Sequence, residues 1–289
     1  MLSPVICQLG PLQLRWYGLC AALAILAAYL LMARRAKRYG LDGNQAADIL
    51  FLCVVAGLAG ARLEYVRRFW SEVFADDPLA VFRVWEGGLV FQGGFILALA
   101  AVWIMCRIRR WRLGDVGDLM AVVLPVGHAI SRMGCLLNGC CFGRPWNGFL
   151  SVTYPPAEND VLASQIANGF LPSGATASLP VFPVQALEAL MCLAIAGVVL
   201  LLERRDLLRR QRFTVYMLLY ALGRFAVEFL RGDYRQAAGT SFLTPAQLIS
   251  VAIVLPLTAA VVAVSAWRSR RRFHAQPQPS KEQHVKKGK

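Results

Sequence analysis

Seven long apolar segments constrain the fold more than any other feature of this sequence. Each is long enough to cross a hydrocarbon core of about 30 Å, which takes roughly 17 to 25 residues of α-helix. The segments lie near residues 14–33, 46–66, 88–106, 115–133, 181–202, 213–230 and 246–267. They predict an all-α integral membrane protein with seven transmembrane helices.

Basic residues on alternate loops predict the orientation of these helices. Clusters that begin at Arg34, Arg107 and Arg204, together with the segment after Trp267, hold most of the 31 Lys and Arg residues. Because cytoplasmic loops are enriched in Lys and Arg, we expect the N-terminus outside and the C-terminus in the cytoplasm. The net charge of +14 thus has a topological explanation, and nucleic-acid binding is not predicted.

The polar stretches outside the helices predict two further parts. Residues 1–267 form one seven-helix membrane domain, within which residues 144–180 are too polar and proline-rich to span. We expect 144–180 to form a small outer cap, or alternatively an irregular connector. The basic tail, residues 268–289, is expected to be disordered and to contact anionic lipid in the cytoplasm.

Three arginines, Arg62, Arg132 and Arg224, lie within or at the outer ends of predicted helices. Burying a guanidinium there costs about 2.5 to 3.5 kcal/mol unless it has a partner or a wet cavity. One explanation is structural pairing with carboxylates of the same helices, for which the candidates are Glu64, Glu188 and Glu228. The other is a shared outward cavity that binds a lipid phosphate, which arginine grips through parallel hydrogen bonds.

Other residues lie at the same outer ends. The stretch VWEGGLVFQGGF (84–95) contains two glycine pairs, which permit close approach either to a ligand or to another helix. Trp16 and Tyr17 begin the first helix at the expected outer interface, and Tyr220 lies one turn before Arg224.

The eight cysteines show no C-x-x-C pair and no histidine at a zinc-ligand spacing, so the sequence predicts no metal site. Most are scattered through apolar helices, where a thiol acts as a small hydrophobic group. Cys135, Cys140 and Cys141 cluster on the expected outer side. The spacing leaves a disulfide among them open.

Several motifs in order carry a family resemblance. They are RWYGL near the start, FRVWEGGLVFQGG (82–94), GHAISRMGCLLNGCCFGR (127–144), FPVQALE (182–188) and YALGRFAVEFLR (220–231). In order and spacing the chain resembles the bacterial prolipoprotein diacylglyceryl transferase family, from about Pro4 to Trp267. The arginine-glycine stretch and the R-x-x-V-E-F-x-R stretch make the resemblance specific.

The resemblance implies a multi-pass enzyme of the bacterial inner (plasma) membrane. Such an enzyme moves the diacylglyceryl group of phosphatidylglycerol onto the lipobox cysteine of a preprolipoprotein signal peptide. The products are a thioether and glycerol 1-phosphate, in the first step of lipoprotein maturation. Neither a cofactor nor a metal is implied, and the partners are membrane lipid and the secreted substrate.

The resemblance also assigns roles to residues. The positions expected to be catalytic are Arg132, Arg224, Tyr220, Tyr17 and Gln92. The positions expected to bind substrate are Arg62, Asn138, Gly143, Glu228, Gly93, Gly94 and Arg231.

The chain departs from the family pattern at three positions. Gln92 replaces the motif histidine, Cys135 replaces an asparagine, and Cys140 replaces an acidic residue. A glutamine amide orients groups by hydrogen bonds but is no base at ordinary pH. Three explanations remain: Gln92 only positions substrate while the arginines activate the thiol; His128 has become the base; or the chain is a non-catalytic or altered-specificity phospholipid-binding paralogue.

Overall fold

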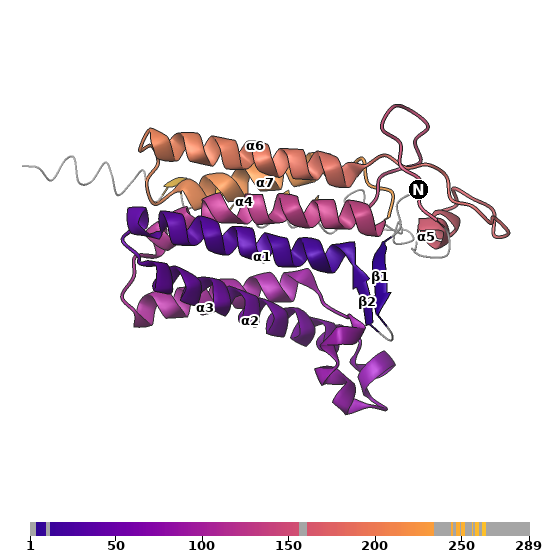
Figure 1. Ribbon diagram of the computed structural model, residues 1–289, viewed down its shortest axis with the longest axis horizontal. Helices are drawn as coiled ribbons and strands as arrows, with labels where there is room; N and C mark the ends of the chain where they lie inside the picture. Colours follow the sequence, from indigo (N-terminus) through magenta and orange to yellow (C-terminus); the bar gives the residue numbers. More distant parts are fainter. Residues whose placement is uncertain are drawn as a thin grey trace, which may run out of the picture.

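The computed structural model describes residues 4–9, 12–155 and 161–233, together with isolated positions between 244 and 263. The chain is mostly helical, and its long helices run roughly parallel to one another (Figure 1). Five helices are long and apolar enough to cross a membrane: α1 (Trp16–Arg35), α2 (Gly43–Arg68), α3 (Phe91–Ile108), α4 (Leu113–Asn138) and α6 (Val184–Arg204). They confirm the first five predicted segments as helices, each displaced by a few residues.

The last two predicted segments are described less completely. Helix α7 (Arg212–Glu228) matches the sixth segment. Most of the seventh segment, 246–267, lies outside the described residues, and its described positions between 247 and 263 are helical. The predicted tail at 268–289 lies outside the described residues altogether.

Helix α4 organises the bundle, because α1, α6 and α7 all pack against it. Helices α2 and α3 form a close pair that joins the rest through α1 (Figure 1). Small residues allow these approaches: a Cβ on Gly134 of α4 would lie 2.8 Å from the Cβ of Cys20 in α1. The C-terminal end of α4 is therefore held between α1 and α6.

Short elements surround the long helices. An antiparallel hairpin of β1 (Val5–Leu9) and β2 (Leu12–Arg15) leads into α1 and was not predicted. Five short helical segments occupy the loops: η1 (Ala36–Tyr39), η2 (Trp70–Phe74), η3 (Pro78–Phe82), η4 (Val84–Glu86) and α5 (Val161–Ala167).

The described part of the region 144–180, residues 144–155 and 161–180, lies beyond the ends of α4 and α6, beside the hairpin (Figure 1). It contains α5, and its Tyr154 and Val161 pack with Phe142 and Val181 in a small apolar cluster. The Tyr154 hydroxyl donates a hydrogen bond of 2.7 Å to the carbonyl of Leu136. This bond ties the region to the last turn of α4.

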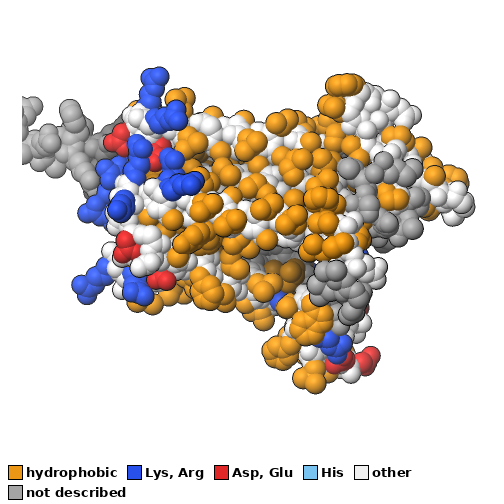
Figure 2. All heavy atoms as spheres, in the orientation of Figure 1, with side chains coloured by type: hydrophobic (Ala, Val, Ile, Leu, Met, Phe, Trp, Pro, Cys, Tyr) orange, Lys and Arg blue, Asp and Glu red, His pale blue; other side chains and the backbone are white. Residues whose placement is uncertain are grey.

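Charged and apolar side chains are segregated along the bundle. Lys and Arg side chains gather at one end, and apolar side chains cover the middle of the visible face (Figure 2). Exposed apolar residues such as Phe51, Leu63 and Leu190 lie on the long helices, as expected for surfaces that contact lipid. At the basic end, Arg35 and Arg38 pair with the fully buried Glu203.

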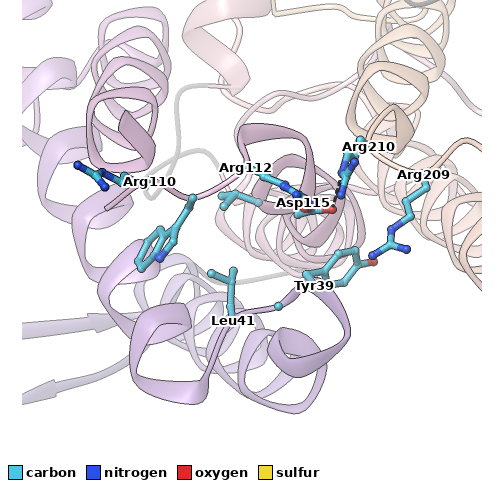
Figure 3. Close-up of a pocket in the computed structure, with 10 residues that line it drawn as sticks. Tyr39, Leu41, Arg110, Arg112, Asp115, Arg209 and Arg210 are labelled. Atoms are coloured by element: carbon cyan, nitrogen blue, oxygen red, sulfur yellow. Dashed lines mark hydrogen bonds and ion pairs between the residues drawn. The ribbon is translucent and has the colours of Figure 1, made fainter. Parts of the chain in front are cut away.

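A pocket of about 300 Å³ also lies at the basic end. Its labelled lining residues are Tyr39, Leu41, Arg110, Arg112, Asp115, Arg209 and Arg210 (Figure 3). Nε of Arg210 lies 3.1 Å from the carboxylate of Asp115. The pocket is at the start of α4, whereas the predicted Arg132 lies near its end, so it is not part of the predicted site.

Candidate active site

A buried carboxylate joins two of the three predicted arginines. Glu188 of α6 has no exposed surface, and its Oε2 lies 2.8 Å from Nε of Arg132 in α4. Its Oε1 accepts a hydrogen bond of 3.0 Å from Nη1 of Arg224 in α7. Helices α4, α6 and α7 thus meet at one ionic cluster near the end of α4.

A second carboxylate completes this cluster. Nη2 of Arg224 lies 2.6 Å from Oε2 of Glu228, one helical turn later. The other oxygen of Glu228 accepts a hydrogen bond of 2.6 Å from the hydroxyl of Thr244. Two guanidinium groups face two carboxylates, so structural pairing explains how both arginines are tolerated inside the helices.

The two terminal nitrogens of Arg132 are still able to donate hydrogen bonds. Among the described residues, both of its polar contacts are made by Nε, with Glu188 and with Nε2 of His128 at 3.1 Å. Its side chain is 15% exposed. The two terminal nitrogens are therefore left to donate to a ligand, and a phosphate accepts two parallel hydrogen bonds of this kind.

His128 belongs to this site, although the family motif does not place a histidine there. A guanidinium nitrogen can only donate, so Nε2 of His128 accepts the bond from Arg132 and carries no proton in this arrangement. Its ring lies 5.1 Å from that of Tyr220, which stacks on Tyr216 at 6.1 Å. The structure thus brings the predicted Tyr220 to the Arg132 side of the cluster.

Arg62 lies in a different environment. Its three guanidinium nitrogens donate to main-chain carbonyls, which belong to Ala80, Val81, Arg83, Gly87 and Gly88. Its guanidinium also lies 5.6 Å from the ring centre of Tyr65 and 5.4 Å from that of Phe74. Arg132 and Arg224 therefore lie together, as expected, whereas Arg62 lies apart from them and anchors the loop before α3.

The glycine pair after Gln92 faces a neighbouring helix. A Cβ on Gly93 would lie 2.3 Å from the carbonyl oxygen of Gly60, and one on Gly94 would lie 2.6 Å from that of Gly57. Close packing of α2 on α3 accounts for both glycines. Gln92 itself is exposed at the start of α3, and among the described residues no hydrogen bond joins it to Arg132 or Arg224.

The chain after α4 passes between two other segments. The amide of Gly143 donates to the carbonyl of Phe182 at 3.0 Å, and that of Gly232 donates to Phe142 at 3.0 Å. A Cβ on Gly143 would lie 2.6 Å from the oxygen of Phe182. Gly143 is thus placed where only glycine permits this backbone approach.

Beside Gly143 lies Arg231, which forms an ion pair with Asp233 through Nε at 2.9 Å. Burial raises the pKa of the Asp233 carboxyl above its usual value, although Arg231 opposes this shift. The backbone of Arg231 also pairs with that of Gly143, two residues after Cys141. The predicted Arg231 therefore lies close to the turn that follows α4.

The turn after α4 brings three cysteines together. The thiol of Cys140 donates a hydrogen bond of 3.8 Å to the carbonyl of Cys135, and the sulfur atoms of Cys135, Cys140 and Cys141 all lie within 4.8 Å of one another. The predicted Asn138 is the last residue of α4, directly before this turn. The sequence places these three cysteines on the same side of the membrane, and the turn that ends α4 brings their side chains together.

Tyr17 approaches the same end from α1. Its Cα would lie 3.5 Å from a Cβ placed on Gly134, which lies between Arg132 and Cys135 on α4. Its side chain is half-exposed. Tyr17, Arg132, Tyr220 and Arg224 are thus gathered at one end of the bundle, as predicted, whereas Gln92 and Arg62 belong to the α2–α3 side.

Comparison with known proteins identifies the family. The sequence profile described as "Prolipoprotein diacylglyceryl transferase" matches residues 4–264. Phosphatidylglycerol–prolipoprotein diacylglyceryl transferase of Chromohalobacter salexigens is 32% identical over 276 residues, covering 93% of this chain and 94% of the relative. The protein of the same description from Xanthomonas oryzae pv. oryzae is 33% identical over 288 residues, covering 96% and 94%.

A more distant relative has the same description with the suffix 2. That protein, from Clostridium perfringens, is 27% identical over 251 residues, covering 87% of this chain and 91% of its own. The matches extend over nearly all of the helices described above. The chain belongs to the prolipoprotein diacylglyceryl transferase family.

Proposed function

We propose that this protein transfers the diacylglyceryl group of phosphatidylglycerol to a cysteine thiol of a prolipoprotein. The new bond is a thioether, and the leaving group is glycerol 1-phosphate. Family membership supports the reaction. The observation that supports the location of the active site is the pair of arginines bound by Glu188. The two terminal nitrogens of Arg132 are available there to donate hydrogen bonds to the lipid phosphate.

The arginine pair suits the chemistry of the leaving group. Attack of sulfur on the glyceryl carbon expels a phosphate monoester, whose negative charge grows in the transition state. Donors that are already oriented stabilise such charge most effectively where water is excluded. Glu188 orients both guanidinium groups before the lipid arrives, so little reorganisation is needed.

We assign the predicted residues to roles on this basis. Arg132 and Arg224 bind the phosphate, while Tyr220 and Tyr17 border the reacting groups. Glu228 and Gly143 position this machinery, the first through Arg224 and the second through the backbone crossing at Phe182. Gln92 acts from the α2–α3 side, where it would contact the lipid or the incoming peptide rather than the reacting atoms, and Arg62 holds the loop that leads into α3.

We further propose a seven-helix arrangement in the bacterial inner membrane, with the N-terminus outside. The basic side chains gather at the end where η1, the α3–α4 loop and the α6–α7 loop lie, as the positive-inside rule requires of a cytoplasmic face (Figure 2). The site then opens outward, where residues 144–180 form a cap that receives the lipobox segment of a preprolipoprotein.

The direct test is transfer to a synthetic peptide. Purified protein is mixed with phosphatidylglycerol and a lipobox peptide, and the peptide mass is followed for the addition of one diacylglyceryl unit. We expect a gain that disappears in Arg132→Ala and Arg224→Ala and persists in the matched control Arg107→Ala, at the basic end of α3.

The alternative is a phospholipid-binding paralogue without transferase activity, which the departures at Gln92, Cys135 and Cys140 motivated. Retention of phosphatidylglycerol with no mass gain under any condition would establish that alternative. An active Arg132→Ala variant would refute the phosphate role of that residue.

A further inference from the structure

Three cysteine side chains converge where α4 ends. The sulfur atoms of Cys135, Cys140 and Cys141 all lie within 4.8 Å of one another, and all three are free thiols. Cys135 is buried, and the other two are partly buried. The cluster has the composition and spacing of a site for a soft, thiophilic metal ion.

The backbone is bent specifically to bring them together. Gly139 ends α4 in the left-handed conformation, with φ of 73°, and the amide of Cys140 donates to the carbonyl of Cys135 at 3.2 Å. Cys141 has φ of 59°, which is uncommon for a residue with a side chain. The buried Gln185 supports the turn by donating to the carbonyl of Cys140 at 2.8 Å. Such conformations persist where the surroundings impose them, and they concentrate at functional sites.

Two arginines lie close to the cluster. The backbone of Arg231 pairs with that of Gly143, two residues after Cys141, and Arg132 precedes Cys135 by three residues on α4. Three thiolates without a counter-charge would repel one another. Arg132 and Arg231 are already paired with Glu188 and Asp233, so a divalent cation is the charge that would offset the thiolates.

We propose that Cys135, Cys140 and Cys141 bind a zinc ion whose fourth coordination position takes the cysteine thiol of the prolipoprotein. Zinc binds thiolate at about 2.3 Å in tetrahedral geometry, which sets the sulfur atoms roughly 3.8 Å apart, within reach of the observed cluster by small movements. No fourth His, Cys, Asp or Glu joins the group among the described residues. A zinc site with three protein ligands and one open position is the catalytic kind rather than the structural kind.

The position of the cluster fits this role, which rests on the proposed transferase function. Cys135 follows Arg132 by three residues on α4, so the zinc-bound sulfur and the phosphate of the lipid would meet at one helix end. Tyr17 lies close to the same helix end, because its Cα would be 3.5 Å from a Cβ placed on Gly134, the residue before Cys135.

The step balances without a redox change. The substrate thiol loses its proton to water when its sulfur binds zinc, because a coordinating thiol is deprotonated. The sulfur then attacks the glyceryl carbon, the new C–S bond replaces the C–O bond to phosphate, and the electron pair of that bond leaves on the phosphate oxygen. Arg132 and Arg224 stabilise the departing glycerol 1-phosphate, and zinc remains divalent throughout.

Zinc would also take over the role of the motif histidine that Gln92 replaces. Gln92 cannot accept a proton, and it is exposed at the start of α3. Metal coordination is a recognised means of activating a nucleophile without an adjacent base. The two departures from the family pattern that introduce Cys135 and Cys140 thus compensate for the departure at Gln92.

The first experiment is metal analysis of the purified protein. We expect about one zinc ion per chain, the content of a single three-thiolate site, with loss of zinc in Cys135→Ser, Cys140→Ser and Cys141→Ser. Cys7→Ser, which changes the exposed cysteine of the hairpin, is the matched control and should keep the metal. Protein that contains copper instead, or an intact mass that shows a disulfide and no metal, would overturn the assignment.

The second experiment tests the open position in the intact chain. Cobalt(II) is exchanged for zinc, and its visible absorption is recorded while a lipobox peptide is added. We expect the spectrum to change with the cysteine peptide and not with the same peptide carrying serine. A spectrum that does not change when the cysteine peptide is added would refute binding of the substrate thiol at the fourth coordination position. Because the measurement needs no turnover, it is valid whether or not lipid transfer occurs.

Different results would refute the zinc site and the proposed transferase function. Protein stripped of zinc by a chelator should lose transfer and regain it with zinc. Full transfer by zinc-free protein would refute the zinc inference while the transferase assignment stands. Zinc that binds and responds to the peptide thiol, in protein that never transfers lipid, would support the metal site while the proposed function fails.

Discussion

Glu188 and Arg132 form an ion pair of 2.8 Å between α6 and α4, and the carboxylate has no exposed surface. The same carboxylate holds Arg224 from α7. A single buried residue therefore fixes the relative positions of both arginines proposed to bind phosphate. This pairing makes the geometry of the site dependent on α6, which contributes neither arginine.

Replacing Glu188 with Gln should disorder both arginines. The variant leaves two partly uncompensated guanidinium groups, and breaking a buried pair costs about 3 to 5 kcal/mol. We expect a lower melting temperature in detergent and at least tenfold slower transfer. Glu64→Gln is the control, because Glu64 pairs with Arg67 and Arg68 at the surface of α2, and it should leave both measurements nearly unchanged. Wild-type transfer by Glu188→Gln would contradict the positioning role.

Gly93→Ala should separate α2 from α3. The added methyl group would lie 2.3 Å from the carbonyl oxygen of Gly60, and overpacking of this kind costs about 1 to 3 kcal/mol. Thermal unfolding in detergent measures the loss. Gly57→Ala is the matched control on the same helix pair, since a Cβ there has no neighbour within 4 Å. Equal stability of the two variants would show that packing does not explain Gly93.

Arg62→Ala should release the loop before α3. Five carbonyls between residues 80 and 88 lose their donor, and an unsatisfied buried acceptor costs about 1 to 3 kcal/mol. We expect faster cleavage of this loop in limited proteolysis than in Arg68→Ala, whose partner is Glu64 at the surface. A cleavage rate equal to that of the control would leave the anchoring role without support.

His128→Gln separates two accounts of thiol activation. Glutamine can still accept a hydrogen bond from Arg132 but cannot act as a base. If zinc activates the thiol, transfer should fall by less than about tenfold, whereas removing a general base lowers the rate by roughly 10² to 10⁴. A loss in the larger range, with zinc content unchanged, would identify His128 as the base.

The local sequence pattern was sufficient to predict the long helices but not every short element around them. Apolar length predicted α1, α2, α3, α4 and α6 to within a few residues, because a membrane span is defined by composition along one segment. The hairpin of β1 and β2 was missed, since four- and five-residue strands leave little periodicity to detect. Segment 246–267 stays a prediction.

The sequence by itself determined the family, the membrane helices and the residue types at the site, because each is recorded in local composition and motif order. It also raised the two explanations for the buried arginines without choosing between them. Only the tertiary structure decided that Glu188 serves Arg132 and Arg224 together, that Arg62 binds main-chain carbonyls, and that three cysteines form one cluster. These outcomes depend on distances between side chains of different helices and on left-handed turns, which spacing along the chain does not encode.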